Sequence, residues 1–181
     1  MAGYGEIEEQ INDDMFIVSE RTWNLFHKTE KIILDTSVTI KWFFNEDEEN
    51  TQAANLILNR YLDNEIGIII PEIAIFEIAN VIKYRIKTAQ NKHIGANIID
   101  KIFNLGIIFY INKEILKNAF NIAIDINESV YDCIFIATAE YFKSKMITDD
   151  RKLFSKYLKH KTANVKDNAG KIEIILLENY A

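Results

Sequence analysis

The chain has 181 residues, of which 49% are apolar, and a formal net charge of −6. This length and apolar content fit one globular domain with a sizeable core and exclude a disordered chain. A single cysteine excludes an internal disulfide, and no apolar run reaches the roughly 20 residues of a membrane span, so we expect a cytoplasmic protein without a membrane partner.

The negative charge is concentrated at the amino terminus. Residues 1–30 contain seven acidic and two basic residues, a net charge of −5, so the rest of the chain is close to neutral. We interpret residues 1–30 as an acidic N-terminal extension and residues 31–181 as one domain. Two basic stretches, 83–92 and 151–166, lie within this domain. Each is interpreted equally well as a solvated helix face or as a surface for a polyanion.

From residue 31 onward, short apolar segments alternate with apolar residues at helical spacing. In chain order we predict a strand at 31–34, a helix at 47–62, a strand at 65–70, a helix from 71 to about 87, a helix at 94–105, a strand at 107–110, helices at 115–126 and 130–142, a strand at 145–148, a helix at 150–158 and a strand at 171–177. This alternation indicates βαβ units and an α/β fold of three layers, α/β/α, whose central sheet is mostly parallel.

Four acidic residues lie on separate segments at positions that such a fold directs to one edge of the sheet. Asp35 and Asp150 follow strands, and Asp132 is close to the start of a helix that is apolar on nearly every face. Glu77 interrupts the apolar face of a helix, where an unpartnered carboxylate is costly. Two like charges about 4 Å apart repel by roughly 4 kcal/mol at an effective dielectric near 20. We therefore interpret the four acids as a site for Mg²⁺ or Mn²⁺, which prefer oxygen ligands and support phosphodiester hydrolysis.

Three of these positions also have an ordinary structural interpretation. Asp35 is followed by Thr and Ser and is equally well interpreted as a helix N-cap. Asp132 stands three residues after Ser129 in a capping arrangement. At the end of the strand at 145–148, either Asp149 or Asp150 caps the next helix while the other faces the sheet edge, and the sequence does not decide which.

Several other kinds of chemistry lack support in the sequence. There is no Walker A loop, no GxGxxG turn and no GxSxG elbow, which leaves ATP use, dinucleotide binding and serine-hydrolase chemistry without a motif. The three histidines have no spacing for a zinc site. Cys133 lies in an apolar helix, which favours a small buried residue over a nucleophile.

The motifs LDTSV, FEIAN, YDCIFIATA and TDD, in this order, resemble those of the PIN domain family, and most closely its VapC-type toxin ribonucleases. The similarity covers about residues 31–177, where KWFFNEDEE also resembles the family. The resemblance implies cleavage of RNA, homodimerisation and inhibition by a cognate antitoxin. It implies that the acidic site holding Mg²⁺ or Mn²⁺ is formed by Asp35, Glu77, Asp132 and Asp150. Ser37 and Thr148 match family positions that support this site.

The chain departs from the family pattern at Asp149, where a small residue is usual. This extra charge is either a bystander or a modifier of metal affinity. Candidates for RNA binding come from the two basic stretches: Arg85 and Lys87 from the first, Arg151 and Lys152 from the second.

The thirty-residue leader is a second departure, because the usual chain of the family begins almost at the first strand. We hypothesise that its negative charge and its patch of Trp23 and Phe26 let it lie over the basic groove, where it would regulate RNA access or oligomerisation. The alternative is a weakly ordered tail or an incorrectly assigned start.

Two other function classes remain open. A non-catalytic PIN-like protein that binds RNA or acts as a scaffold would use the same fold. A HAD-like phosphatase would also place an Asp after its first strand, but its nucleophile motif needs Asp-x-Asp and Ser37 occupies the second place. The nuclease is therefore favoured.

Overall fold

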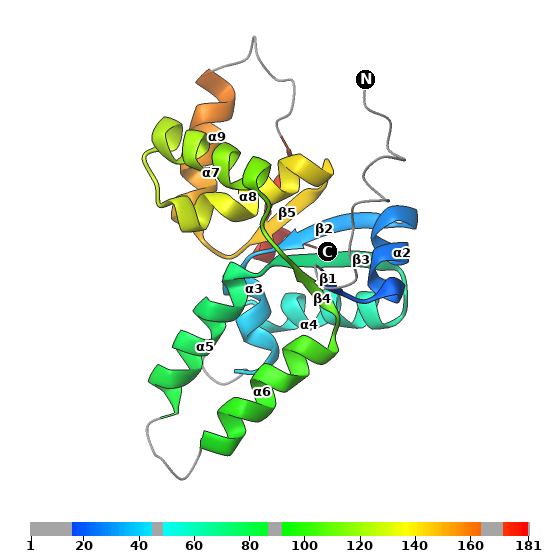
Figure 1. Ribbon diagram of the computed structural model, residues 1–181. Coiled ribbons are helices and arrows are strands. Elements are labelled where there is room, and N and C mark those ends of the chain that lie inside the picture. The colour runs from blue at the N-terminus through cyan, green and yellow to red at the C-terminus, as the bar shows by residue number, and fades with distance from the viewer. Residues whose placement is uncertain (1–15, 45–48, 87–91, 164–171, 181) are drawn as a thin grey trace.

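The computed structural model describes residues 16–44, 49–86, 92–163 and 172–180 (Figure 1). These residues form a mixed α/β fold around a six-stranded sheet in the order β1-β4-β3-β2-β5-β6. The five strands from β4 to β6 are parallel, and β1 pairs antiparallel with β4. The strands are β1 (Phe16–Val18), β2 (Glu30–Leu34), β3 (Ile66–Pro71), β4 (Ile107–Phe109), β5 (Lys145–Thr148) and β6 (Ile174–Leu176).

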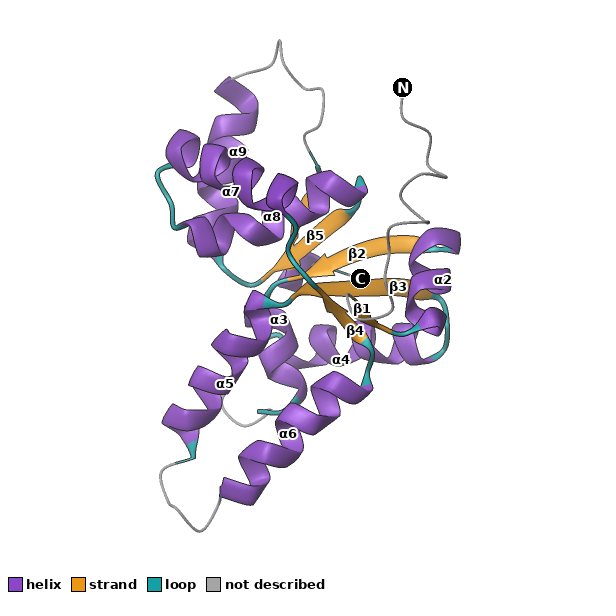
Figure 2. Cartoon of the chain, in the orientation of Figure 1, coloured by secondary structure: helices purple, strands orange, loops and turns teal. Residues whose placement is uncertain are grey.

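Helices make the connections between the strands (Figure 2). The α-helices are α2 (Glu20–Lys28), α3 (Thr36–Thr39), α4 (Thr51–Leu62), α5 (Ile73–Arg85), α6 (Lys92–Asn104), α7 (Lys113–Ile126), α8 (Val130–Phe142) and α9 (Arg151–Ala163). Two 3₁₀ helices, η2 (Ile40–Trp42) and η4 (Leu177–Asn179), follow α3 and β6. None of the described helices has the length and apolar composition that crossing a bilayer requires.

The fold class and the five predicted strands and six predicted helices are confirmed, with ends displaced by a few residues. One displacement has a clear cause. The helix expected to begin at Pro71 begins at Ile73, because Pro71 is the last residue of β3 and the Glu72 N–H donates to the Phe109 carbonyl at 2.9 Å. The last helix was expected to end at 158 but continues to Ala163.

The strand order explains how helices come to cover both faces of the sheet. From β2 the chain steps to β3 and then β4, but from β4 it returns across the sheet to β5, on the other side of β2. Because parallel crossovers are right-handed, this reversal places α4, α5 and α6 on one face and α7 and α8 on the other. The reversal also creates a switch point between β2 and β5, where the carboxyl ends of open α/β sheets bind ligands.

The core lies between the central strands and α8. All six residues of β3 are buried, as expected of a strand covered on both faces. Seven consecutive residues of α8, from Cys133 to Ala139, are buried as well, and α8 contacts β2, β3 and β5. This confirms the prediction of a central buried helix. On the opposite side of the sheet, α5 and α6 project together as an arm (Figure 1).

The amino-terminal segment contains two elements that the sequence analysis did not predict, β1 and α2. Ser19 caps α2 by accepting a hydrogen bond from the Thr22 N–H, and Phe26 has no exposed surface. The backbone of α2 lies directly on β3, because a Cβ atom built on Gly67 would be 2.2 Å from the Cα of Phe26. Trp23 packs edge-on against Phe142 of α8.

The proposed Trp23 and Phe26 docking patch is therefore wrong. Both residues are packed against the core, at the end of the sheet away from the carboxyl ends of β2 and β5 (Figure 1). Residues 1–15 of the acidic extension lie outside the described residues.

Candidate functional site

The candidate site lies at the switch point, where β2 and β5 end side by side. Leu34 of β2 is paired with Ile147 of β5, and the Asp35 N–H donates to the Ile147 carbonyl at 3.1 Å. Asp35 therefore follows the end of β2 at the same height in the sheet as Thr148, the last residue of β5. The predicted strand-end positions of Asp35 and Asp150 are confirmed by this register.

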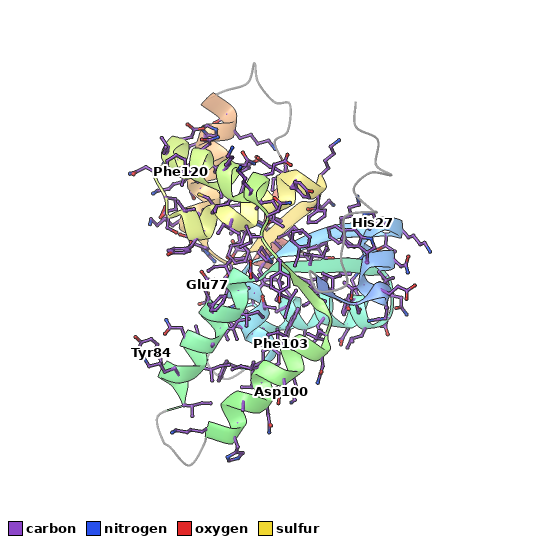
Figure 3. The ribbon with its side chains drawn as sticks, in the orientation of Figure 1. His27, Glu77, Tyr84, Asp100, Phe103 and Phe120 are labelled. Atoms are coloured by element: carbon purple, nitrogen blue, oxygen red, sulfur yellow. The ribbon has the colours of Figure 1, made fainter. Side chains whose placement is uncertain are left out.

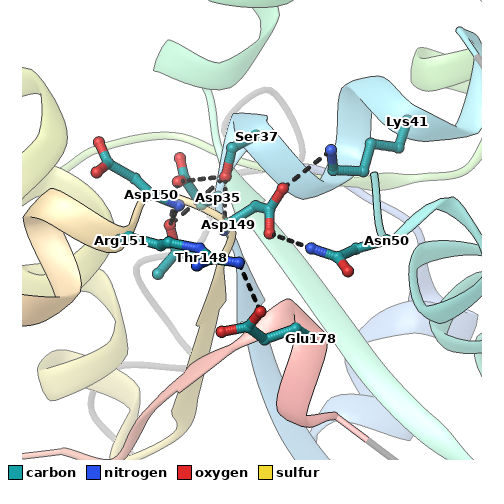
Figure 4. Close-up of polar contacts among 9 residues, drawn as sticks. All are labelled: Asp35, Ser37, Lys41, Asn50, Thr148, Asp149, Asp150, Arg151 and Glu178. Atoms are coloured by element: carbon teal, nitrogen blue, oxygen red, sulfur yellow. Dashed lines mark hydrogen bonds and ion pairs between the residues drawn. The ribbon is translucent and has the colours of Figure 1, made fainter. Parts of the chain in front are cut away.

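Asp35 is held by two hydroxyl groups. Its Oδ2 atom accepts hydrogen bonds from Thr148 Oγ1 at 2.6 Å and from Ser37 Oγ at 2.8 Å (Figure 4). Asp35 occupies the N-cap position of α3, but its side chain makes no capping hydrogen bond. Only 8% of the residue is exposed, and this burial raises the pKa of its carboxyl, although the two hydroxyls act in the opposite direction.

Glu77 faces this region from α5 (Figure 3). Thr36 Oγ1 donates a short hydrogen bond to Glu77 Oε2, so the residue after Asp35 holds the second acid. The pKa of Glu77 is raised by partial burial and, to a smaller extent, by the charges of Asp35 and Asp132. The sequence analysis considered Thr36 only as part of a possible cap. Its place between Asp35 and Ser37 was the signal that could have identified it.

Asp132 stands in the first turn of α8, where it is bound to Ser129, the N-cap residue of that helix. Ser129 Oγ donates to Asp132 Oδ2 at 2.6 Å and accepts from the Asp132 N–H at 3.1 Å. This confirms the capping arrangement. The charge of Asp132 also raises the pKa of Asp35 and of Glu77, so the three acids lie within electrostatic range of one another. Electrostatic effects therefore connect three of the four predicted acids.

Asp150 has a weaker connection to the other three acids. Its Oδ1 atom accepts hydrogen bonds from the N–H groups of Lys152 at 2.8 Å and Leu153 at 2.9 Å, which caps α9. The pKa of Lys152 is raised mainly by Glu128, and also by the nearby charges of Asp150 and Asp132. Asp150 thus borders the same space while one of its oxygens stabilises a helix.

Asp149, the departure from the family pattern, makes different contacts. Its carboxylate binds Lys41 Nζ at 3.0 Å and the Asn50 side-chain amide at 2.8 Å. Figure 4 shows it directed toward Lys41 and Asn50, whereas Asp150 points to the other side of Thr148. Neither Lys41, the first residue of KWFFNEDEE, nor Asn50 was expected near the site, because nothing in the sequence indicates that they contact Asp149.

The donor set fits a hard divalent cation in its chemistry. Carboxylates and hydroxyls are the ligands that Mg²⁺ and Mn²⁺ prefer, and a cation would relieve the repulsion that adds to the effect of burial on the pKa values of Asp35 and Glu77. Within the part of the chain that the structure describes, however, no three Asp, Glu, His or Cys side chains already form a metal-binding cluster. The acids converge, but several of their oxygens are bonded to hydroxyl or backbone groups.

The predicted RNA-binding side chains are mostly engaged within the protein. Arg151 pairs with Glu178 at 2.6 Å, and Lys152 pairs with Glu128 at 2.8 Å. Arg85 lies over the ring of Phe44, 4.7 Å from its centroid. Lys87 lies outside the described residues.

Cys133 and the histidines take no part in the site. Cys133 is buried, and this burial raises the pKa of its thiol to about 12, which keeps it protonated and unreactive. His27 Nδ1 is hydrogen-bonded to the carbonyl of Trp23, and His160 lies 4.0 Å from Asp125.

Solved structures with a similar fold include a toxin–antitoxin complex. The FitAcB structure from Neisseria gonorrhoeae has 16% identity and a TM-score of 0.59, and the match covers 82% of this chain and 99% of that chain. A DNA-bound VapBC structure from Salmonella typhimurium has 13% identity and a TM-score of 0.55, with the same coverage of both chains. A toxin–antitoxin complex from Klebsiella pneumoniae has 18% identity and a TM-score of 0.54, covering 69% of this chain and 91% of that chain.

At these identities the likeness establishes a shared fold. No curated protein sequence matches the chain significantly. The PIN domain family matches residues 32–159, which span the sheet from β2 to β5 and all the acids of the candidate site. Together with the strand order and the position of the switch point, this match shows that the chain belongs to the PIN domain family.

Proposed function

We propose that this chain is a metal-dependent endoribonuclease and the toxin of a toxin–antitoxin pair. The observation that carries the proposal is the grouping of Asp35, Glu77 and Asp132 near the switch point, where burial raises the pKa of Asp35 and of Glu77 and the charge of Asp132 adds to both effects. A fold that only needed structural carboxylates would gain nothing from placing them within range of each other, because like charges repel. The convergence is expected of a site that binds a cation.

In this proposal the cation is held by Asp35, Glu77, Asp132 and Asp150. When bound, Mg²⁺ or Mn²⁺ supplies an activated water and stabilises the leaving oxygen of the phosphodiester. The chain's own hydroxyls keep the ligands in place: Thr148 and Ser37 orient Asp35, Thr36 orients Glu77, and Ser129 orients Asp132. Lys152, at the edge of the acidic group, is the cation best placed to meet a phosphate.

RNA as the substrate rests on the resemblance to VapC-type toxins. The partners rest on that resemblance and on the similar structures, which include toxin–antitoxin complexes, one of them bound to DNA.

Large exposed apolar side chains on α7 support a homodimer, with Leu116, Phe120 and Ile124 spaced one helical turn apart. Phe76 and Tyr84 on the α5 arm offer a second exposed surface, which suits an antitoxin. A cytoplasmic location is part of the same proposal.

The test uses the purified full chain and a mixed RNA pool. With Mn²⁺, the wild-type protein should produce discrete RNA fragments on a denaturing gel, and EDTA should abolish them. Asp132→Asn should be inactive while keeping the circular dichroism spectrum and the melting temperature of the wild type. RNA binding that is independent of metal, without cleavage by either protein, would instead favour the scaffold function. Activity on a phosphomonoester with a covalent phospho-aspartate would favour the phosphatase.

A further inference from the structure

The strand β5 ends in two adjacent acids, and the structure gives them different surroundings. The carboxylate of Asp149 is bound on both oxygens: Oδ2 by Lys41 Nζ at 3.0 Å and Oδ1 by the Asn50 amide at 2.8 Å. Only 4% of the Lys41 side chain and 19% of the Asp149 side chain are exposed. Asp150 has no comparable ion pair among the described residues and faces the side where Lys152 and Asp132 lie.

Burial makes the Lys41–Asp149 pair difficult to break. A buried ammonium group that loses its partner keeps the desolvation penalty without the compensating attraction, so removal of one member is strongly destabilising. Asn50 also depends on this contact. It lies at the N-cap position of α4 with a φ of 59°, and its side chain makes no capping hydrogen bond because it is turned toward Asp149. The Asp149 side chain thus ties η2 and the start of α4 to the end of β5.

The main chain of Asp149 belongs to the acidic site, unlike its side chain. The Asp149 N–H donates to Ser37 Oγ at 2.9 Å, and Ser37 Oγ donates to Asp35 Oδ2 at 2.8 Å. This fixes Ser37 as an acceptor from Asp149 and a donor to Asp35. The Asp149 side chain can therefore bind Lys41 while the Asp149 N–H still donates to the Ser37 hydroxyl, which orients Asp35.

We infer that Lys41 is a positioning residue that keeps the Asp149 carboxylate out of the cation-binding set. The fourth acid is then Asp150, and Asp149 contributes through its main-chain N–H. This inference rests on the proposed function in assuming that the acids bind a divalent cation. For Asp149 to act as a ligand, its carboxylate would have to leave both Lys41 and Asn50, which would break a buried ion pair and a hydrogen bond.

The first experiment needs no metal. Unfolding in urea is followed in EDTA for the wild type, Lys41→Met, Asp149→Asn and the double variant. Each single variant should lower the unfolding midpoint, and the double variant should lose clearly less than the sum of the two single losses, because neither charge is left alone. Additive losses would overturn the inference, because the two side chains would not act as a pair.

The second experiment is a calorimetric titration of the same four proteins with Mn²⁺, without RNA. Asp149→Asn should weaken binding about tenfold, because one negative charge beside Lys41 is lost, and Lys41→Met should strengthen it several-fold, because one positive charge near the ion is removed and the Asp149 carboxylate is released. The charge-neutral double variant should bind within about threefold of the wild type. If Asp149 is itself a ligand, the double variant will remain as weak as Asp149→Asn, which overturns the inference.

The pair formed by Lys145 and Glu30 is a matched control. These residues lie 2.9 Å apart at the amino ends of β5 and β2, away from the acids. The double variant Lys145→Met/Glu30→Gln should not change Mn²⁺ affinity, and a change equal to that at Lys41 would overturn the inference. If the wild type binds no Mn²⁺, the proposed function fails and the ligand assignment fails with it, while the urea experiment still decides whether Lys41 and Asp149 act as a pair.

Discussion

Thr148 on β5 donates a 2.6 Å hydrogen bond to Oδ2 of Asp35 at the end of β2 and so joins the two strands that flank the switch point. Thr148 has no exposed surface, and Asp35 is 8% exposed, so water does not readily replace this contact. The orientation of the most buried acid therefore depends on a neighbouring strand and not only on its own loop. Several predictions about metal binding and stability derive from this arrangement and from the contacts around it.

Replacing Thr148 by Val keeps the shape of the side chain and removes the donor. We expect the free energy of unfolding in EDTA to fall by about 1–3 kcal/mol, because a buried carboxylate oxygen loses a partner. Mn²⁺ affinity should fall as well, since the pKa of Asp35 rises when the hydroxyl is lost. Thr138→Val is the matched control, because Thr138 is equally buried but donates to the Ile134 carbonyl within α8. The control should leave Mn²⁺ affinity unchanged; an equal loss in both variants would contradict a specific role for Thr148.

The acidic group should make stability depend on pH in a particular direction. Burial raises the pKa of Asp35 above its ordinary 3.8 and that of Glu77 above its ordinary 4.5. Over the interval between the ordinary and the raised values the folded protein binds more protons than the unfolded chain, so the free energy of unfolding falls as the pH rises through that interval. Urea titrations in EDTA at a series of pH values measure this slope.

The Asp35→Asn variant isolates the contribution of Asp35 to that slope. Glu128, whose pKa is lowered by Lys152 and Lys156, acts in the opposite direction and is present in both proteins. The wild type should therefore lose more stability than Asp35→Asn as the pH rises above 3.8, and near neutral pH the variant should be as stable as the wild type or more so. A marked loss of stability in Asp35→Asn at neutral pH would show that the carboxylate has a structural role.

Glu128 should restrain RNA binding, because it pairs with Lys152 at 2.8 Å and with Lys156. In Glu128→Gln both lysines are released to meet phosphates, so we expect tighter binding of single-stranded RNA and a steeper dependence of affinity on salt. Fluorescence anisotropy at several salt concentrations, with Asp132→Asn as the inactive background, measures both effects. Glu178→Gln, which releases Arg151 in the same way, is the comparison. Unchanged affinity in both variants would place the RNA path elsewhere.

The exposed apolar side chains of α7 should control assembly. Phe120 is 55% exposed and lies between Leu116 and Ile124 on the outer side of the helix (Figure 3). Phe120→Lys should convert a dimer to a monomer in light-scattering measurements without lowering the melting temperature of the monomer, because this side chain is not part of the core. Leu62→Lys is the control, since Leu62 is 50% exposed on α4. If both variants remain dimeric, the dimer does not use α7.

Much of the fold could be predicted from the sequence because its strands are short apolar segments with clear ends. β1 and α2 were missed for two reasons. The segment around Trp23 and Phe26 lies within a strongly charged leader, and its apolar residues are few. The signal that was present is local: Ser19 begins the helix as its cap, and Trp23 and Phe26 follow at a spacing of one turn. The residue against which the backbone of α2 packs at Phe26, Gly67 on β3, is distant in the sequence and carries no side chain to reveal the contact.

The candidate acids were predictable for a similar reason, since Asp35, Asp132 and Asp150 stand near the ends of strands or helices that the pattern identifies and Glu77 interrupts the apolar face of a helix. Their partners were only partly predictable. Ser37 and Ser129 stand close in sequence to the acids that they bind, whereas Lys41 and Asn50 reach Asp149 from another part of the chain. The residue pattern alone did not decide between the two acids at the end of β5, and the family resemblance implied Asp150. The structure adds that the two carboxylates have different long-range contacts.

The residue at the position of Gly67 indicates whether another PIN domain has room for an amino-terminal helix packed as α2 is here. Even an alanine at this position would collide with the backbone of α2, at Phe26, and no rotation of a side chain relieves a clash with main-chain atoms. A relative that carries a larger residue there must have lost this helix or seated it elsewhere, whereas a relative that keeps the glycine retains room for it. The residue at position 67 of β3 thus indicates whether a helix from the amino-terminal segment can pack on the sheet.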